Sequence, residues 1–174
     1  DQSIKAKVIR KIAICCYRLG LSAKNVTVIF QNTADRSLFI DNKIICDSQA
    51  VLIPGSGVDL NYLRFTPEPE EFPVVMFLAR FLKDKGIVEF VEASSIVKAS
   101  FPSARFVLVG NVDSDNPNSI SPNDLNSWVK LGLVEDWGYS TDIFSTIRKS
   151  NLMVLPSYRE GLPKSLLEAA ACGR

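Results

Sequence analysis

Apolar positions in the second half of the chain come in short runs, and stretches of helical period separate these runs. Short apolar runs rich in β-branched residues predict buried strands, and the amphipathic stretches between them predict helices. The predicted strands are 74–79, 105–109, 133–138 and 152–155, and the predicted helices are 87–99, 124–131, 142–149 and 163–172. Strands that alternate with helices predict an α/β fold, a Rossmann-like parallel sheet with helices on both faces.

The first part of the chain has its own pattern. A helix is predicted over 4–19, and its apolar residues form one stripe of helical period: Ile4, Val8, Ile12, Cys15, Cys16 and Leu19. Basic residues fill much of the remaining surface of this helix. We favour a domain helix with a solvated basic face, and the alternative is an amphipathic helix lying on an anionic membrane. Strands at 26–30 and 50–53 and a helix at 34–40 follow.

Residues 65–73 contain three prolines and no hydrophobic periodicity. We interpret this segment as a linker, which predicts one domain up to residue 66 and a second over 67–174. The alternative is a long surface loop within one domain. The final Gly173-Arg174 resembles the lead-in to another strand, so we expect a fragment, truncated at both ends.

Composition excludes several function classes. The formal net charge of +1 gives no reason to expect nucleic acid as a partner. The sequence contains no histidine, which excludes a Ser-His-Asp triad, a Cys-His pair and most zinc sites. The four cysteines form no Cys-x-x-Cys pair, no apolar run approaches a membrane span, and the first residues do not form a signal peptide. A reduced cytoplasmic setting is therefore expected, with chemistry by carboxylates, Lys, Arg and backbone amides.

Charged residues follow the strand at 74–79. Ligands bind beyond the carboxyl ends of parallel strands, and this is where Arg80 and Lys85 lie. Together they are suited to clamp a diphosphate, since arginine offers a planar fork and lysine a point charge. A solvated turn is the equal alternative. Gly110 ends the strand 105–109 but belongs to no Gly-x-Gly-x-x-Gly fingerprint.

The last fifteen residues form a loop that runs into a helix. Pro163 suits the first helical position, and the N–H groups near Ser165 and Leu166 are then suited to bind an anion. Glu160 precedes the helix and Glu168 lies within it. The two glutamates are suited to act as a catalytic acid/base pair or as hydrogen-bond acceptors for hydroxyl groups of a ligand. Taken alone, Glu168 is typical of an ordinary acid on a helix surface.

Taken in order, these segments resemble the retaining, GT-B-fold glycosyltransferases of family 4 (group 1), from about residue 26 to the end. The similar segments are Pro54-Gly55-Ser56-Gly57-Val58-Asp59, Ala79-Arg80 with Lys85-Gly86, Val107-Leu108-Val109-Gly110, Pro156-Ser157, and Glu160-Gly161-Leu162-Pro163 through Glu168-Ala169. Phe30-Gln31-Asn32 with Leu38-Phe39 is similar to members that build bacterial capsule and lipopolysaccharide.

The resemblance implies a role for each site residue. Arg80 and Lys85 would hold the donor diphosphate and stabilise the leaving group, with no metal and no cofactor besides the nucleotide sugar as substrate. Glu160 would contact hydroxyls of the transferred sugar, beside the N–H groups of Gly161 and Leu162. Glu168 would accept hydrogen bonds from the ribose, and the N–H groups of Ser165 and Leu166 would meet the distal phosphate. Gly110 and Trp137 would border the base.

The implied reaction is transfer of a sugar, with retention, to a saccharide or lipid-linked acceptor in cell-surface polysaccharide biosynthesis. The expected location is the cytoplasm, with the inner face of the membrane as a place of contact. Residues 1–66 would be the end of an acceptor-side domain, so the fragment alone is expected to be inactive. The sequence departs from the family at Ala79, where glycine is usual. A non-catalytic nucleotide-sugar-binding module and a sugar-nucleotide epimerase of the same architecture remain alternatives.

Overall fold

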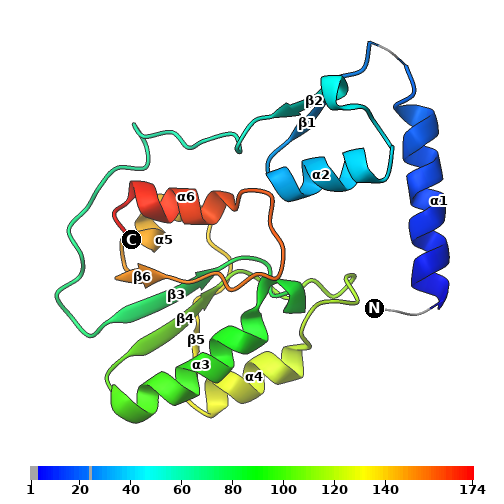
Figure 1. Ribbon diagram of the computed structural model, residues 1–174. Coiled ribbons are helices and arrows are strands. Elements are labelled where there is room, and N and C mark those ends of the chain that lie inside the picture. Colours follow the sequence, from blue (N-terminus) through cyan, green and yellow to red (C-terminus); the bar gives the residue numbers. More distant parts are fainter. Residues whose placement is uncertain (1–3, 24) are drawn as a thin grey trace. The chain divides into compact units, whose positions relative to one another are not determined.

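The computed structural model describes residues 4–23 and 25–174 (Figure 1). The chain divides into two compact units, with the division between Ser56 and Gly57. No helix within the described ranges is both long enough and apolar enough to cross a membrane.

The first unit is a small α/β unit. Its elements are α1 (Ile4–Gly20), β1 (Val28–Phe30), α2 (Thr33–Asp41), the short 3-10 helix η1 (Asp47–Gln49) and β2 (Ala50–Leu52). β1 and β2 pair in parallel, with Val28 opposite Ala50. Asn32 caps α2 by accepting a hydrogen bond from the backbone N–H of Asp35 at 2.7 Å. Buried Phe30, Ile44 and Ile45 form the core of this unit.

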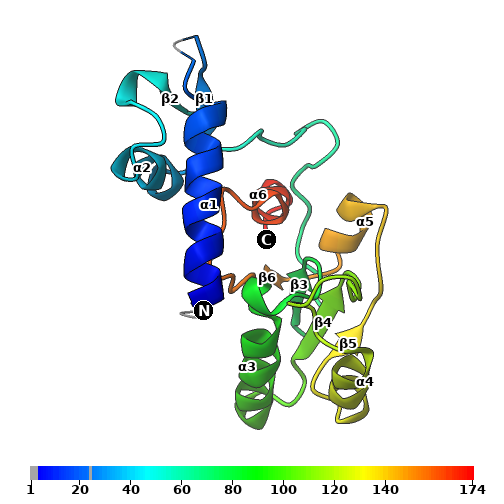
Figure 2. The same cartoon turned by 90° about the vertical axis from the view of Figure 1, so that its right-hand side faces the viewer.

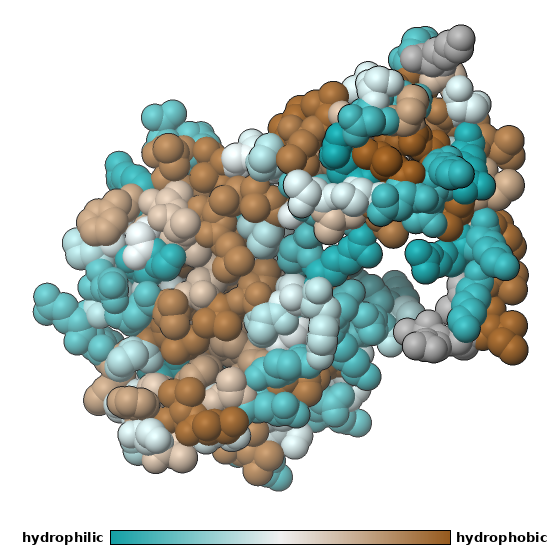
Figure 3. Space-filling model, viewed as in Figure 1, coloured by the Kyte–Doolittle hydropathy of each residue, from teal (hydrophilic) through white to brown (hydrophobic). Residues whose placement is uncertain are grey.

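α1 packs on this unit through a different face from its apolar stripe. Ile14 lies against the core, and the Tyr17 ring lies 5.4 Å from the Phe39 ring, centroid to centroid. The stripe faces solvent, and Ile4 and Leu19 are 83% and 73% exposed. Figure 3 shows apolar side chains gathered along one side of α1. α1 is therefore a helix of the first unit with an exposed basic face, as favoured from the sequence, but the residues that pack on the core lie outside the apolar stripe.

The second unit contains the large sheet. Its strands are β3 (Val74–Leu78), β4 (Arg105–Val109), β5 (Glu135–Asp136) and β6 (Leu152–Met153). They pair in parallel in the order β5-β4-β3-β6, with Met76 of β3 opposite both Val107 and Met153. The helical elements are η2 (Lys83–Lys85), α3 (Ile87–Ser100), α4 (Pro122–Lys130), α5 (Ile143–Ile147) and α6 (Lys164–Ala171).

Helices cover both faces of the large sheet (Figure 2). α3 and α4 lie on one face, over a core centred on the rings of Phe77, Phe90 and Phe106. α5 and α6 lie on the other face, over a second core that includes Met76 and Ile147. Continuous apolar strands are required here because both faces of each central strand are buried. The predicted α/β fold with a parallel sheet is confirmed.

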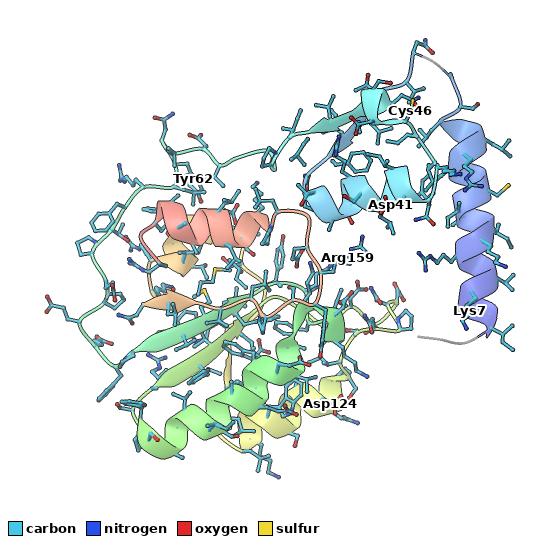
Figure 4. The ribbon with its side chains drawn as sticks, viewed as in Figure 1. Lys7, Asp41, Cys46, Tyr62, Asp124 and Arg159 are labelled. Atoms are coloured by element: carbon cyan, nitrogen blue, oxygen red, sulfur yellow. The ribbon has the colours of Figure 1, made fainter. Side chains whose placement is uncertain are left out.

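The segment 57–66 belongs to the second unit. Leu63 is 4% exposed within its core, and the Thr66 N–H donates to the Cys172 carbonyl at 3.3 Å. The Arg174 guanidinium donates to the carbonyl oxygens of Thr66 and Pro67, both at 2.9 Å. Figure 4 labels Tyr62 on this segment. The division at residue 56 thus differs from the predicted boundary at residue 66, because these contacts hold the segment against α6.

Candidate functional site

Arg80 lies in the loop that connects β3 to α3, beyond the carboxyl end of β3. The neighbouring β4–α4 loop supports it, since the Phe81 N–H donates to the Asn111 carbonyl at 3.0 Å and the Lys83 N–H donates to the Asn118 carbonyl at 2.8 Å. The Arg80 guanidinium donates to Asp113 at 3.1 Å. The Arg80 side chain is 60% exposed, so most of the guanidinium remains accessible to an anion.

Lys85 connects two distant parts of the chain. Its ammonium lies 2.6 Å from the Glu160 carboxylate, and about a quarter of each side chain is exposed (25% and 23%). Burial raises the pKa of Glu160, but hydrogen bonds from Lys85 and Ser157 and the Lys85 charge bring this pKa below its ordinary value. Glu160 is therefore a carboxylate at neutral pH. The ion pair thus joins the loop of Arg80 and Lys85 to the loop of Glu160. Figure 4 labels Arg159, the residue before Glu160, in the second of these loops.

Gly86 allows the two loops to approach each other. Its φ of 77° lies in the left-handed region, and a Cβ at this position would lie 2.2 Å from the Pro156 carbonyl oxygen. The Tyr158 N–H donates to the Asp84 carbonyl at 3.0 Å on the same side. The position of Lys85 against Glu160 therefore depends on backbone contact as well as on the ion pair.

Gly110 makes a second close approach, at the end of β4. A Cβ here would lie 2.0 Å from the Ala79 carbonyl oxygen, so only glycine fits. Gly110 and Arg80 line one cavity of ≈ 430 Å³, together with Ala79, Tyr139, Ser140 and Thr141. The cavity lies at the carboxyl ends of β3 and β4, where parallel sheets bind ligands.

α6 begins at Lys164, with Pro163 as the N-cap residue rather than the first helical one. Gly161 and Leu162 are half-buried in the loop before it, as is Ser165 in its first turn. The Leu166 N–H donates to the Pro163 carbonyl at 3.2 Å, which leaves Lys164 and Ser165 better placed to donate to an anion. The Glu168 carboxylate lies 3.6 Å from the Lys164 ammonium.

Trp137 is not brought together with the other predicted residues. Its indole N–H donates to Glu135 at 3.1 Å, and the Arg105 guanidinium carbon lies 5.9 Å from its ring centroid. The ring lines a separate cavity of ≈ 630 Å³ that includes Val74, the first residue of β3. Residues i and i+2 of an extended strand share a face, and the contacts with Glu135 and Arg105 direct the Trp137 ring back along that face toward the starts of β3 and β4.

Two residues that sequence reasoning missed lie at the site. Asp113 pairs with Arg80, and Tyr139 lines the Gly110 cavity with its side chain 73% exposed. The signal for Tyr139 was its position in the loop after a predicted strand. Asp113 also lies in the loop after a predicted strand, but that polar loop (111–121) contains several acids and amides, so the sequence did not single out Asp113 as the partner of Arg80.

The arrangement has a clear electrostatic character. Two cations, Arg80 and Lys85, lie in one loop at the strand ends, and both contact acids from other loops. The loop that leads into α6, whose start offers N–H donors, is joined to the loop of these cations by Glu160. Such a set of donors suits an elongated anionic ligand that carries hydroxyl groups. The individual roles of these residues stay predictions.

Comparisons with known proteins identify relatives of the chain. A family model described as glycosyl transferases group 1 matches residues 72–174. The chain is 33% identical over 189 residues to an N,N'-diacetylbacillosaminyl-diphospho-undecaprenol alpha-1,3-N-acetylgalactosaminyltransferase of Campylobacter jejuni, which covers 100% of the chain and 47% of that protein. It is 31% identical over 105 residues to a UDP-Gal:alpha-D-GlcNAc-diphosphoundecaprenol alpha-1,3-galactosyltransferase of Escherichia coli, covering 58% of the chain and 26% of that protein.

Solved structures share the fold. Anabaena HepE, solved in complex with UDP and glucose, superposes with a TM-score of 0.72 at 21% identity, over 92% of this chain and 47% of that one. WaaG, a glycosyltransferase involved in lipopolysaccharide biosynthesis, superposes with a TM-score of 0.69 at 17% identity, over 87% and 43%. The chain spans about half the length of the Campylobacter relative and of these two proteins. Because the family model matches more than half of its residues, the chain belongs to the group 1 glycosyltransferases, with their GT-B α/β architecture.

Proposed function

We propose that the whole protein transfers a sugar from a UDP-sugar to a saccharide carried on undecaprenyl diphosphate. The observation that carries this proposal is the contact of Lys85 with Glu160, which joins the two loops of the site across 75 residues of sequence. The nucleotide and acceptor follow from relatives, since the Escherichia coli protein is named for UDP-Gal and both named transferases for diphospho-undecaprenol substrates. The Campylobacter relative favours an N-acetylhexosamine as the transferred sugar.

In the proposed mechanism, the protein stabilises departing charge. Arg80 and Lys85 bind the donor diphosphate and lower the energy of the negative charge that develops when the sugar leaves. These two cations supply positive charge without a metal ion, so we propose metal-independent transfer. The N–H groups at the start of α6 bind the distal phosphate. Retention of configuration is part of the proposal and agrees with the alpha linkages in the relatives' names if the donor sugar is α-linked.

The remaining groups hold the donor's hydroxyls and base. Glu160 accepts hydrogen bonds from the transferred sugar beside Gly161 and Leu162, and Glu168 accepts from the ribose hydroxyls. The Glu168 side chain is only 13% exposed, which favours a fixed acceptor over a mobile surface acid. Gly110 and the loop around Tyr139 border the cavity proposed for the base.

Nucleotide titration tests the site. We expect the protein to bind UDP more tightly than GDP in calorimetry, and we expect Arg80→Ala and Glu168→Ala to weaken UDP binding at least about tenfold. Matched controls are Lys130→Ala and Glu92→Ala, whose side chains are exposed on α4 and α3 and should leave binding unchanged. UDP affinity unchanged in both site variants would refute the assignment.

A transfer assay tests the reaction. Incubation with a UDP-sugar and an undecaprenyl diphosphate saccharide should give an extended lipid-linked product, and EDTA should not reduce its yield. Donor binding without transfer or donor hydrolysis would favour a non-catalytic binding module. Formation of an isomeric UDP-sugar without acceptor would favour an epimerase.

We also propose that α1 contacts the surface of an anionic membrane, where an undecaprenyl-linked acceptor resides. α1 carries five basic residues and no acidic one: Lys5, Lys7, Arg10, Lys11 and Arg18. Its apolar stripe is exposed, including Val8 at 50% and Ile12 at 59%. Exposed aliphatic side chains beside cations are the composition of an interfacial helix, and the proposed location is the cytoplasmic leaflet.

Vesicle sedimentation tests this contact. The protein should sediment with phosphatidylglycerol vesicles and much less with phosphatidylcholine vesicles, and Ile12→Glu should reduce sedimentation. The control is Ile96→Glu, because Ile96 is 73% exposed on α3 of the second unit. Equal loss in both variants, or sedimentation that does not depend on lipid charge, would contradict the contact and favour a protein partner for the stripe.

A further inference from the structure

Each of three cations at the site pairs with an acid. Arg80 pairs with Asp113 at 3.1 Å, Lys85 with Glu160 at 2.6 Å, and Lys164 with Glu168 at 3.6 Å. Of these three pairs, that of Lys85 with Glu160 is the shortest and has both partners about three-quarters buried. Charge-assisted hydrogen bonds of this length in partly buried surroundings are stronger than exposed pairs.

The proposed function assigns the same Lys85 ammonium to the donor diphosphate. A diphosphate brought to Lys85 meets the Glu160 carboxylate, and two anions on one cation repel each other. The depressed pKa of Glu160 means that protonation does not relieve this repulsion at neutral pH. Diphosphate binding therefore requires Glu160 to give up part of its interaction with Lys85.

Glu160 keeps its hydrogen bond from Ser157, but loss of Lys85 as a donor is costly for a carboxylate that is about three-quarters buried, so a new donor would stabilise it. The intact nucleotide sugar brings hydroxyl groups that can donate to it, whereas a free nucleoside diphosphate brings none at that position. We infer that Glu160 and the diphosphate compete for Lys85, so that Glu160 makes the site favour the intact nucleotide sugar over the released nucleoside diphosphate. Glu160 then also promotes release of the product after transfer. This inference rests on the proposed function of the site.

The affinity ratio of UDP-N-acetylgalactosamine to UDP tests the inference, measured by calorimetry without acceptor. In Glu160→Gln, UDP should bind about tenfold more tightly, the effect expected when one charge-assisted competitor is removed. The nucleotide sugar should not gain affinity, so the affinity ratio should fall at least about tenfold. Glu168→Gln is the matched control. Both ligands contain the ribose that Glu168 is proposed to bind, so this variant should leave the affinity ratio unchanged.

A double variant identifies Lys85 as the shared partner. In the Lys85→Gln background, Glu160→Gln should change UDP affinity much less than in the wild-type background. Circular dichroism verifies that each variant is folded, and Glu160→Ala replaces Glu160→Gln if the latter is not. An affinity ratio unchanged by Glu160→Gln would overturn the inference, and so would an equal gain in UDP affinity in the wild-type and Lys85→Gln backgrounds. If the wild-type protein still binds UDP, the proposed function stands in either case. Wild-type protein that binds neither ligand overturns both.

Discussion

Gly86 is the position where a single methyl group should separate the two loops of the site. Two costs arise in Gly86→Ala. The φ of 77° places the new side chain in the left-handed region, which costs about 1–2 kcal/mol. The Cβ would also lie 2.2 Å from the Pro156 carbonyl oxygen and 2.6 Å from its carbonyl carbon, and relief of such overpacking costs about 1–3 kcal/mol. We expect the free energy of unfolding of the second unit to fall by about 2–5 kcal/mol.

Gly132→Ala separates the two costs. Gly132 has a φ of 70°, and a Cβ there meets nothing within 4 Å, so only the conformational cost of about 1–2 kcal/mol applies. Urea titration followed by tryptophan fluorescence is the suitable assay, because Trp128 and Trp137 both lie in the second unit. Equal destabilisation of the two variants, within about 0.5 kcal/mol, would show that the Pro156 contact is unimportant and would refute the reasoning.

Three further predictions concern charge and reactivity. Asp142 accepts hydrogen bonds from Ser145 and Tyr62, which lower its pKa from 3.8 to about 2, so its contribution to stability is present above pH 3.8 and is lost as the pH falls through 2. The difference in free energy of unfolding between wild type and Asp142→Asn should narrow over that range in acid urea titrations. Glu135→Gln should lower the free energy of unfolding by about 0.5–1 kcal/mol in the same assay, because the side chains of Glu135 and its bidentate partner Arg105 are each 40% exposed and solvent screens the pair. A loss several times larger would mean that the pair is effectively buried. Burial raises the pKa of the Cys172 thiol, so three cysteines should react rapidly with a disulfide reagent and Cys172 only on unfolding; four equal rates in folded protein would contradict this.

The central strands were predictable from the sequence because burial on both faces requires a continuous apolar run. The predicted strand 105–109 matches β4, and 74–79 differs from β3 by its last residue. Helix ends were less predictable. α4 begins at Pro122 rather than residue 124, because Ser121 and Asp124 form a reciprocal capping box. That capping signal was present in the sequence as Ser-Pro-Asn-Asp.

Contacts between loops were beyond prediction. The placement of Arg80, Lys85, Glu160 and Glu168 near one edge of the sheet follows from parallel topology, which the alternation of strands and helices indicates. The partner of each side chain depends on how loops from different strands pack, and sequence spacing contains no such information. The orientation of α1 has a similar explanation. Its apolar stripe predicted a buried face, but hydrophobic period alone does not say what covers that face.

The contacts of Arg174 with the segment around Thr66 affect how the second unit folds. The hydrogen bond from Arg174 to the Thr66 carbonyl closes a loop between residues 108 apart in sequence. Contacts of such long range raise contact order and form only after the intervening chain is organised. During synthesis, therefore, the segment 57–66 leaves the ribosome before α6 and docks against it only after α6 has been made. Synthesis of α6 is therefore a precondition for the contacts that hold the segment in place.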